Sequence, residues 1–366
     1  MRDDGRIALL AGAGLSFDAD LPMSVQLAAN LRSALTEMAQ NPGGTTEAVI
    51  KRETAKRWLS LFNFLNGGVH FQEGVIGRNP DAPVNIEQIA IAAEELIART
   101  RNPLAPYAAG WHRRIDELEA EDRNILRSFV DFTYSRLREE LALHDSQKAT
   151  YMERLKDLCE DKRGLDIFTL NYDLCIETAL KAGEVRFANG FSKEGRWSPS
   201  TFAGRTRIKL FKLHGSLDWV DDQVYGLCSL QFPKHEIAET IETEQTRPTL
   251  IFGTAHKLSA REPFLTLAYH FAQRVLKTEI LAIVGYSFGD EHVNQIIEQG
   301  LKKNGRLRII VVSPHAQDSI SKEKFLDRNP RVFPVDTGAK IAFNDCLLRD
   351  QIRKCLQDAA EEAPFQ

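Results

Sequence analysis

Four short clusters of glycine and polar residues carry the side-chain types that enzyme chemistry needs. Each cluster directly follows a short apolar run, at the point where a buried strand is expected to end. Ligands of open α/β sheets bind beyond the carboxyl ends of the strands, so these residues are expected to face a site rather than the core. The clusters are Gly12-Ala13-Gly14-Leu15-Ser16, Thr169-Leu170-Asn171-Tyr172-Asp173, Lys212-Leu213-His214-Gly215-Ser216 and Val284-Gly285-Tyr286-Ser287-Phe288-Gly289-Asp290.

The first cluster places two glycines at a strand-to-helix turn. Such a turn lets backbone N–H groups approach a pyrophosphate at the start of a helix. The dinucleotide fingerprint Gly-x-Gly-x-x-Gly needs a glycine at position 17, where Phe17 stands, so the ordinary dehydrogenase motif is not matched. Taken alone, the turn equally suits glycines that are needed only for chain geometry.

The other clusters also leave two interpretations open. Asn171 or Asp173 is suited to cap a helix over residues 174–179, and Asp290 to cap the next helix, as well as to bind a ligand. A lone histidine is usually a structural hydrogen-bonding group, although His214, followed at once by glycine at a strand end, is well placed for chemistry.

The elements that position these clusters form an alternating pattern. The short apolar runs are typical of strands buried on both faces, as in a parallel sheet; they cover 7–11, 166–170, 208–213, 250–252, 280–284 and 307–312. Helical spacing follows two of them, at Leu27, Leu31, Leu35 and Met38, and at Val293, Ile296, Ile297 and Leu301. The alternation predicts an α/β fold with a Rossmann-like open parallel sheet and helices on both faces.

A long stretch without a convincing strand interrupts this pattern and carries helical apolar stripes instead. They lie at Trp58, Leu61, Phe62 and Leu65, at Ile86, Ile89, Ala90, Ala93, Leu96 and Ile97, and at Leu126, Val130, Tyr134, Leu137 and Leu141. The stretch predicts an all-helical insertion that splits the α/β domain, followed near the end of the chain by an amphipathic helix over 347–356. The expected parts are the first part of the core at 1–41, the insertion at 42–163, the second part of the core at 164–320 and a C-terminal helical extension at 321–366.

Composition excludes several classes of protein. The 366 residues are 43% hydrophobic and 27% charged, which excludes a mostly disordered chain. The net charge of −4 provides no basic field, so direct nucleic-acid binding is not expected. No apolar run approaches the roughly 20 residues of a membrane helix, and we expect a cytoplasmic protein without membrane association. Five scattered cysteines without a Cys-x-x-Cys pair disfavour a disulfide framework and a zinc site.

Taken together and in this order, the four clusters resemble the sirtuin family of NAD-consuming enzymes with a Rossmann-like core. The sequence is more similar to the bacterial sirtuin-like (Sir2-like) branch of antiphage defence, whose motifs commonly read Thr-x-Asn-Tyr-Asp and Gly-Tyr-Ser-Phe-x-Asp. The resemblance spans about residues 6–35 and 164–315 and leaves the insertion unmatched. Sirtuin deacylases differ in carrying two Cys-x-x-Cys pairs that hold zinc, and in continuing the glycine loop as Ile-Pro-x-Phe-Arg where this chain has Leu21-Pro22-Met23-Ser24-Val25.

The resemblance therefore implies an NAD glycohydrolase, which cleaves NAD to nicotinamide and ADP-ribose without a metal. The alternatives are an NAD-dependent protein deacylase and a non-catalytic nucleotide-sensing or scaffold module. By resemblance, Asn171 orients the ribose or the attacking water, His214 accepts a proton, and Asp173 holds the nicotinamide carboxamide. The remaining binding residues implied are Gly12, Ala13, Gly14 and Ser16 for the pyrophosphate, Gly285 and Ser287 for the adenosine side, and Ser313 for the adenine ribose.

An ungated NAD hydrolase would kill its host, so the resemblance also implies an abortive-infection effector whose activity is controlled. Similar chains are effector subunits of two-protein antiviral defence systems, in one of which the partner is a HerA-type hexameric ATPase. We expect a homo-oligomer in which the helical insertion, about 42–160, or the C-terminal helix mediates assembly and docking. The apolar stripes of the insertion are equally well explained as its own core.

Overall fold

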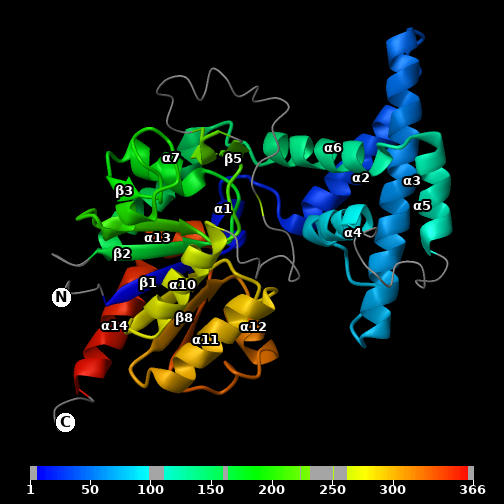
Figure 1. The fold of residues 1–366 in the computed structure, drawn as a ribbon. Helices are drawn as coiled ribbons and strands as arrows, with labels where there is room; N and C mark the ends of the chain where they lie inside the picture. The colour runs from blue at the N-terminus through cyan, green and yellow to red at the C-terminus, as the bar shows by residue number, and fades with distance from the viewer. Residues whose placement is uncertain are drawn as a thin grey trace. The chain divides into compact units, whose positions relative to one another are not determined.

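The computed structural model describes residues 6–98, 111–159, 164–222, 224–230, 250 and 262–361 (Figure 1). The chain divides into two compact units, one made of Met1–Leu21 and Leu141–Gln366 and the other of Pro22–Glu140. These limits differ from the expected insertion at 42–163. The helix predicted from Leu27 to Met38 lies in the second unit and packs with its helices. Residues 146–158, which were expected in the insertion, belong to the first unit.

The first unit is built on a parallel sheet of seven strands in the order β3-β4-β2-β1-β7-β8-β9. Every pair of neighbours in this sheet is parallel, which confirms the predicted fold class. In chain order the strands are β1 (Ile7–Ala11), β2 (Leu165–Thr169), β3 (Phe187–Ala188), β4 (Ile208–Lys212), β7 (Ile280–Val284), β8 (Arg308–Ser313) and β9 (Val332–Asp336). A separate antiparallel hairpin pairs β5 (Trp219–Asp222) with β6 (Gly226–Ser229).

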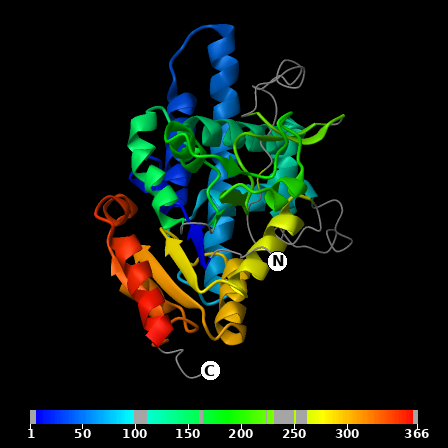
Figure 2. The same ribbon diagram turned by 90° about the vertical axis from the view of Figure 1, so that its left-hand side faces the viewer.

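Helices cover both faces of this sheet because its central strands are apolar on both sides. Figure 2 shows α14 on one side of the strands and α11 on the other. Phe168 and Phe211 stack at 4.7 Å between ring centroids and join a cluster that includes Phe271 of α10. The helical elements of this unit are α1 (Gly14–Phe17), η3 (Ser146–Leu158), α7 (Cys175–Ala182), η4 (Pro199–Ala203), α10 (Phe264–Val275), α11 (Glu291–Lys303), α12 (Ala316–Lys322), α13 (Ala339–Asn344) and α14 (Leu347–Glu361).

Five of the six predicted strands are present within one residue of the expected limits. The sixth, 250–252, lies largely outside the described residues; its first residue, Leu250, forms an isolated bridge with Gly215. The edge strands β3 and β9 were not predicted, and β9 shows that the expected helical extension also contributes to the sheet.

The second unit is helical in the part that the structure describes. Its helices are α2 (Ser24–Gln40), α3 (Thr46–Val75), α4 (Ile86–Ala98), α5 (Trp111–Glu121) and α6 (Ile125–Glu140). The predicted apolar stripes are buried here: Leu61 and Leu65 of α3, Ile89 of α4 and Val130 of α6 are all at most 2% exposed. Trp58 stacks on Phe132 at 4.7 Å between ring centroids.

Candidate active site

The four predicted clusters follow four neighbouring strands, β4, β2, β1 and β7, and therefore meet at one edge of the sheet. Ala11 at the end of β1 pairs with Thr169 of β2 on one side and with Val284 of β7 on the other. The connections run to opposite sides of β1, which makes this edge the topological switch point where open α/β sheets bind ligands.

The glycines at this edge let two loops pack backbone against backbone. The N–H groups of Gly12 and Gly14 donate to the carbonyls of Val284 and Gly285, at 3.0 and 2.9 Å. A Cβ atom at Gly12 would lie 2.6 Å from the Gly285 oxygen, and Gly285 itself has a φ of +65°. Chain geometry therefore explains these glycines. The exposed Ala13 is the residue of the turn whose N–H has no hydrogen-bond partner within the described ranges.

Asn171 links the loop after β2 to α1, the short helix that follows β1. Its Nδ2 donates to the Ser16 Oγ at 3.0 Å, and its own N–H donates to Thr169 Oγ1 at 3.0 Å. Both Asn171 and Ser16 are buried. The sequence therefore identified two residues, 155 positions apart, whose side chains are in contact.

Asp173 lies two residues before α7 and contacts its first residue, but the N-cap position itself is Leu174, so neither Asn171 nor Asp173 is the predicted helix cap. The Asp173 Oδ1 accepts from the N–H of Cys175, the first residue of α7, at 2.9 Å. Burial, with the nearby Asp173 charge, raises the pKa of the Cys175 thiol well above its usual value. A buried thiol with a raised pKa stays protonated at neutral pH.

His214 is held by a carboxylate that comes from another loop. Its Nε2 lies 2.9 Å from Asp290 Oδ2, and the two side chains are 7% and 5% exposed. The other oxygen of Asp290, Oδ1, accepts from the N–H groups of His292 and Val293, at 3.0 and 3.3 Å, at the start of α11. Asp290 is thus both a helix cap and the partner of the histidine. His214 Nδ1 is buried and has no hydrogen-bond partner among the described residues.

Residues 166–330 match the family model of the SIR2-like domain. The matched segment begins in β2 and contains Asn171, Asp173, His214 and Asp290, but not the turn at 12–16. No curated protein matches the chain.

Solved structures of Sir2 proteins resemble the chain at low identity. A mutant Sir2 homologue with 2′-O-acetyl ADP-ribose is 12% identical over 98% of this chain and 94% of its own, with a TM-score of 0.41. A Sir2 homologue–NAD complex is 14% identical over 95% and 90%, with a TM-score of 0.39. A third, Sir2Tm bound to a propionylated peptide, is 9% identical over 96% and 95%, with a TM-score of 0.40.

The SIR2-like segment also contains buried charges that the sequence analysis did not identify. Lys212 Nζ lies 3.1 Å from Glu177 Oε1, and these side chains are 2% and 3% exposed. The same Nζ donates to the backbone oxygens of Tyr172 and Asp173. Burial raises the pKa of Glu177, and the charge of Lys212 opposes that rise. In the sequence, the sign of this buried ion pair is Lys212, a charged residue at the end of an otherwise largely apolar strand.

Two of the predicted binding residues, Ser287 and Ser313, lie at the same edge of the sheet but apart from the hydrogen bonds of Asn171 and His214. Ser287 is exposed in the loop after β7, and the Ser313 Oγ accepts from the His315 N–H at 3.3 Å in a turn of its own. Within the described ranges, no hydrogen bond links either serine to Asn171 or His214. The same part of the chain contains no group of three or more metal-ligating residues and no helix long and apolar enough to span a membrane.

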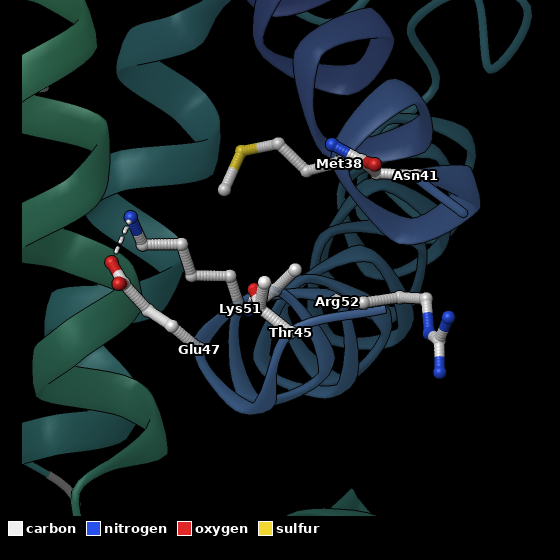
Figure 3. A pocket seen from close by; sticks show the side chains of 7 residues that line it. Met38, Asn41, Thr45, Glu47, Lys51 and Arg52 are labelled. Carbon is white, nitrogen blue, oxygen red and sulfur yellow. Dashed lines mark hydrogen bonds and ion pairs between the residues drawn. The ribbon is translucent and has the colours of Figure 1, made fainter. Parts of the chain in front are cut away.

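A pocket of about 300 Å³ lies in the helical unit, between the end of α2 and the start of α3. Figure 3 shows Lys51 directed toward Glu47, its partner at 2.8 Å, while Arg52 points away from that pair. None of the residues predicted for the active site lines this pocket.

Proposed function

We propose that the chain is an NAD glycohydrolase, which converts NAD and water to nicotinamide, ADP-ribose and a proton. The observation that carries this proposal is that Asn171 and His214 follow the neighbouring strands β2 and β4, at the edge of the sheet that holds the switch point, in a segment that matches the SIR2-like domain. Pure nucleotide binding would need neither a carboxylate-held histidine nor its unpartnered nitrogen.

The residues at this edge are suited to hold NAD as the substrate. A buried polar atom without a hydrogen-bond partner costs about 1–3 kcal/mol of stability. We therefore expect His214 Nδ1 to accept a hydrogen bond from a ligand or a water molecule. The N–H of Ala13 and the hydroxyl of Ser16 are the groups of the glycine turn proposed to contact the pyrophosphate. Since the N–H groups of Gly12 and Gly14 already bond to protein, their part is to allow the turn to form. Asp173, Gly285, Ser287 and Ser313 keep their expected binding roles as proposals.

Cleavage breaks the bond between the ribose C1′ and the pyridinium nitrogen, and the electron pair leaves with neutral nicotinamide. The protein must therefore orient the ribose and stabilise its developing positive charge, rather than protonate the leaving group. Asn171 orients the ribose or the water. The water oxygen bonds to C1′, and His214 accepts the proton that the water releases.

Substitution of the two proposed catalytic residues tests this function. We expect Asn171→Ala and His214→Ala to abolish nicotinamide release while NAD affinity stays within about tenfold, or 1.4 kcal/mol. His144→Ala, at an exposed histidine, is the matched control and should retain full activity. Nicotinamide and ADP-ribose are quantified by chromatography, and NAD affinity by calorimetry.

The outcome separates the three candidate functions. Release that needs no acylated peptide supports the glycohydrolase, whereas release only with such a peptide indicates the deacylase. NAD binding without turnover in any mixture indicates a sensing module. Turnover that survives both substitutions would show that the site is assigned wrongly.

The proposal includes control of this activity, because free hydrolysis would exhaust the NAD of the cell. We place the chain in an antiviral defence system, as a homo-oligomer whose partner is a HerA-type ATPase. Purified chain is assayed alone and with the products of neighbouring genes, and its mass is measured in solution. A fully active monomer at micromolar concentration would contradict this part of the proposal.

A further inference from the structure

We infer that Asp290 is a positioning residue that sets which nitrogen of His214 carries the proton, and so leaves Nδ1 as the base. This inference rests on the proposed function for its kinetic consequences. Its structural basis is the arrangement of donors and acceptors around the two side chains, which holds whatever the substrate.

The carboxylate of Asp290 is committed on both oxygens. Oδ1 accepts the N–H groups of His292 and Val293, and Oδ2 faces His214 Nε2 at 2.9 Å. A carboxylate can only accept hydrogen bonds. Nε2 must therefore be the N–H donor, and in neutral imidazole the other nitrogen then carries the lone pair.

The lone pair is therefore on Nδ1 of His214, the buried nitrogen for which the described part of the chain provides no hydrogen-bond partner. In the reaction proposed above, this nitrogen accepts the proton of the attacking water or of a ribose hydroxyl. With the opposite tautomer Nδ1 would be a donor, and His214 could not act as the base from that side.

Asp290 caps α11 with one oxygen and faces His214 with the other. A single substitution can therefore reverse the tautomer of His214 and still leave the helix capped. In Asp290→Asn, the amide oxygen must accept the N–H groups at the start of α11, which turns the NH₂ group toward Nε2. That nitrogen must then accept, and the proton moves to Nδ1. Asp290→Ser keeps a capping oxygen without placing an amide donor opposite the imidazole. Asp, Asn and Ser are nearly equivalent helix caps, so both variants should keep the start of α11. Asp290→Asn should unfold near the temperature of the natural protein, and Asp290→Ser at a lower one, because His214 Nε2 loses its buried partner.

Kinetics and ¹⁵N NMR of the imidazole test the inference. We expect kcat for NAD to fall by about 10²–10⁴-fold in Asp290→Asn and by less in Asp290→Ser, with NAD affinity unchanged. The His214 resonances, assigned by comparison with His214→Gln, should show the proton on Nε2 in the natural protein and on Nδ1 in Asp290→Asn. Equal kcat in all three proteins, or a proton that stays on Nε2 in the Asn variant, would overturn the inference.

The NMR result separates this inference from the proposed function. If the natural protein does not hydrolyse NAD, the proposed function fails, while the tautomer measurement still decides whether Asp290 positions the proton. If NAD is hydrolysed and the tautomer does not change in Asp290→Asn, only the positioning role fails.

Discussion

Two buried ionisable pairs lie next to the strand ends, and they serve different purposes. Among the described residues, the His214–Asp290 pair leaves one histidine nitrogen without a partner, whereas Lys212 and Glu177 form an ion pair and Lys212 also donates to two backbone oxygens. Those oxygens belong to Tyr172 and Asp173, directly after Asn171. We therefore interpret Lys212–Glu177 as the support that holds the loop of the candidate asparagine in place.

Removing one member of this pair should leave the other charge buried without compensation. We expect Lys212→Met to lower the free energy of unfolding by about 3–5 kcal/mol at pH 8. The double variant Lys212→Met/Glu177→Leu should recover most of that loss, because no buried charge remains. Urea unfolding followed by circular dichroism measures both proteins.

The pH dependence of that loss follows from the raised pKa of Glu177. A carboxyl whose pKa is higher in the folded state stabilises the fold below its unfolded value, near 4.5, and loses that contribution as pH rises through the folded pKa. Without Lys212 the folded pKa rises further. The loss caused by Lys212→Met should therefore shrink between pH 8 and pH 5. An equal loss at both values would contradict the interpretation of an uncompensated charge.

Among the elements, the contact between the β1–α1 turn and the β7–α11 loop decides the geometry of the candidate site. Gly285 adopts a left-handed conformation, and a Cβ atom there would lie 2.3 Å from the Leu15 nitrogen. The turn after β1 and the loop that leads to Asp290 therefore pack against each other through backbone atoms. Within that loop Tyr286 helps to fix Asp290, since the Asp290 N–H donates to the Tyr286 Oη at 3.0 Å.

A methyl group at this contact should be poorly tolerated. We expect Gly285→Ala to lower the free energy of unfolding by about 2 kcal/mol or more, because strain at positive φ adds to the steric clash. Gly289→Ala in the same loop is the matched control, since its Cβ would meet only Ser287 Oγ at 3.6 Å. Urea unfolding compares the two variants, and a similar stability for both would disprove a tight backbone contact.

For the whole molecule, the helical unit has an apolar interior of its own. The buried faces of α2, α3, α4 and α6 pack on one another within residues 22–140. Polar contacts inside the unit include Trp58 Nε1 to Ser128 Oγ at 3.1 Å and Tyr134 Oη to Glu94 Oε1 at 3.0 Å. These contacts favour the second of the two explanations for the apolar stripes, a core internal to the insertion.

Residues 22–140 expressed alone should therefore fold. We expect a helical circular dichroism spectrum and one cooperative thermal transition, because the described helices bury their apolar faces against each other. Leu61→Asp, which places a charge at a fully buried position, is the control that should abolish the transition. A gradual, non-cooperative loss of signal in the unsubstituted fragment would show that its core depends on the rest of the chain.

The sequence by itself determined the central strands, most helices and the clusters at the strand ends. Runs such as Ile280–Val284 must be buried on both faces, and an apolar period of 3.6 residues must place one helix face inward. The apolar pattern did not predict the edge strands β3 and β9, because β3 has two residues and β9 is largely accessible and contains Pro334. An apolar stripe also does not specify which elements it packs against: the sequence analysis grouped residues 27–38 with the α/β core, whereas α2 packs with α3, α4 and α6.

Only the tertiary structure decided which polar groups meet. Asn171 and Ser16 are 155 positions apart, and His214 and Asp290 are 76 apart, so no local period or spacing relates them. Their contact depends on strand order, which places the ends of β4, β2, β1 and β7 side by side. Strand order follows from the packing of the whole core, and hydrogen-bond partners are chosen within that packing, at distances near 3 Å that a linear sequence does not encode.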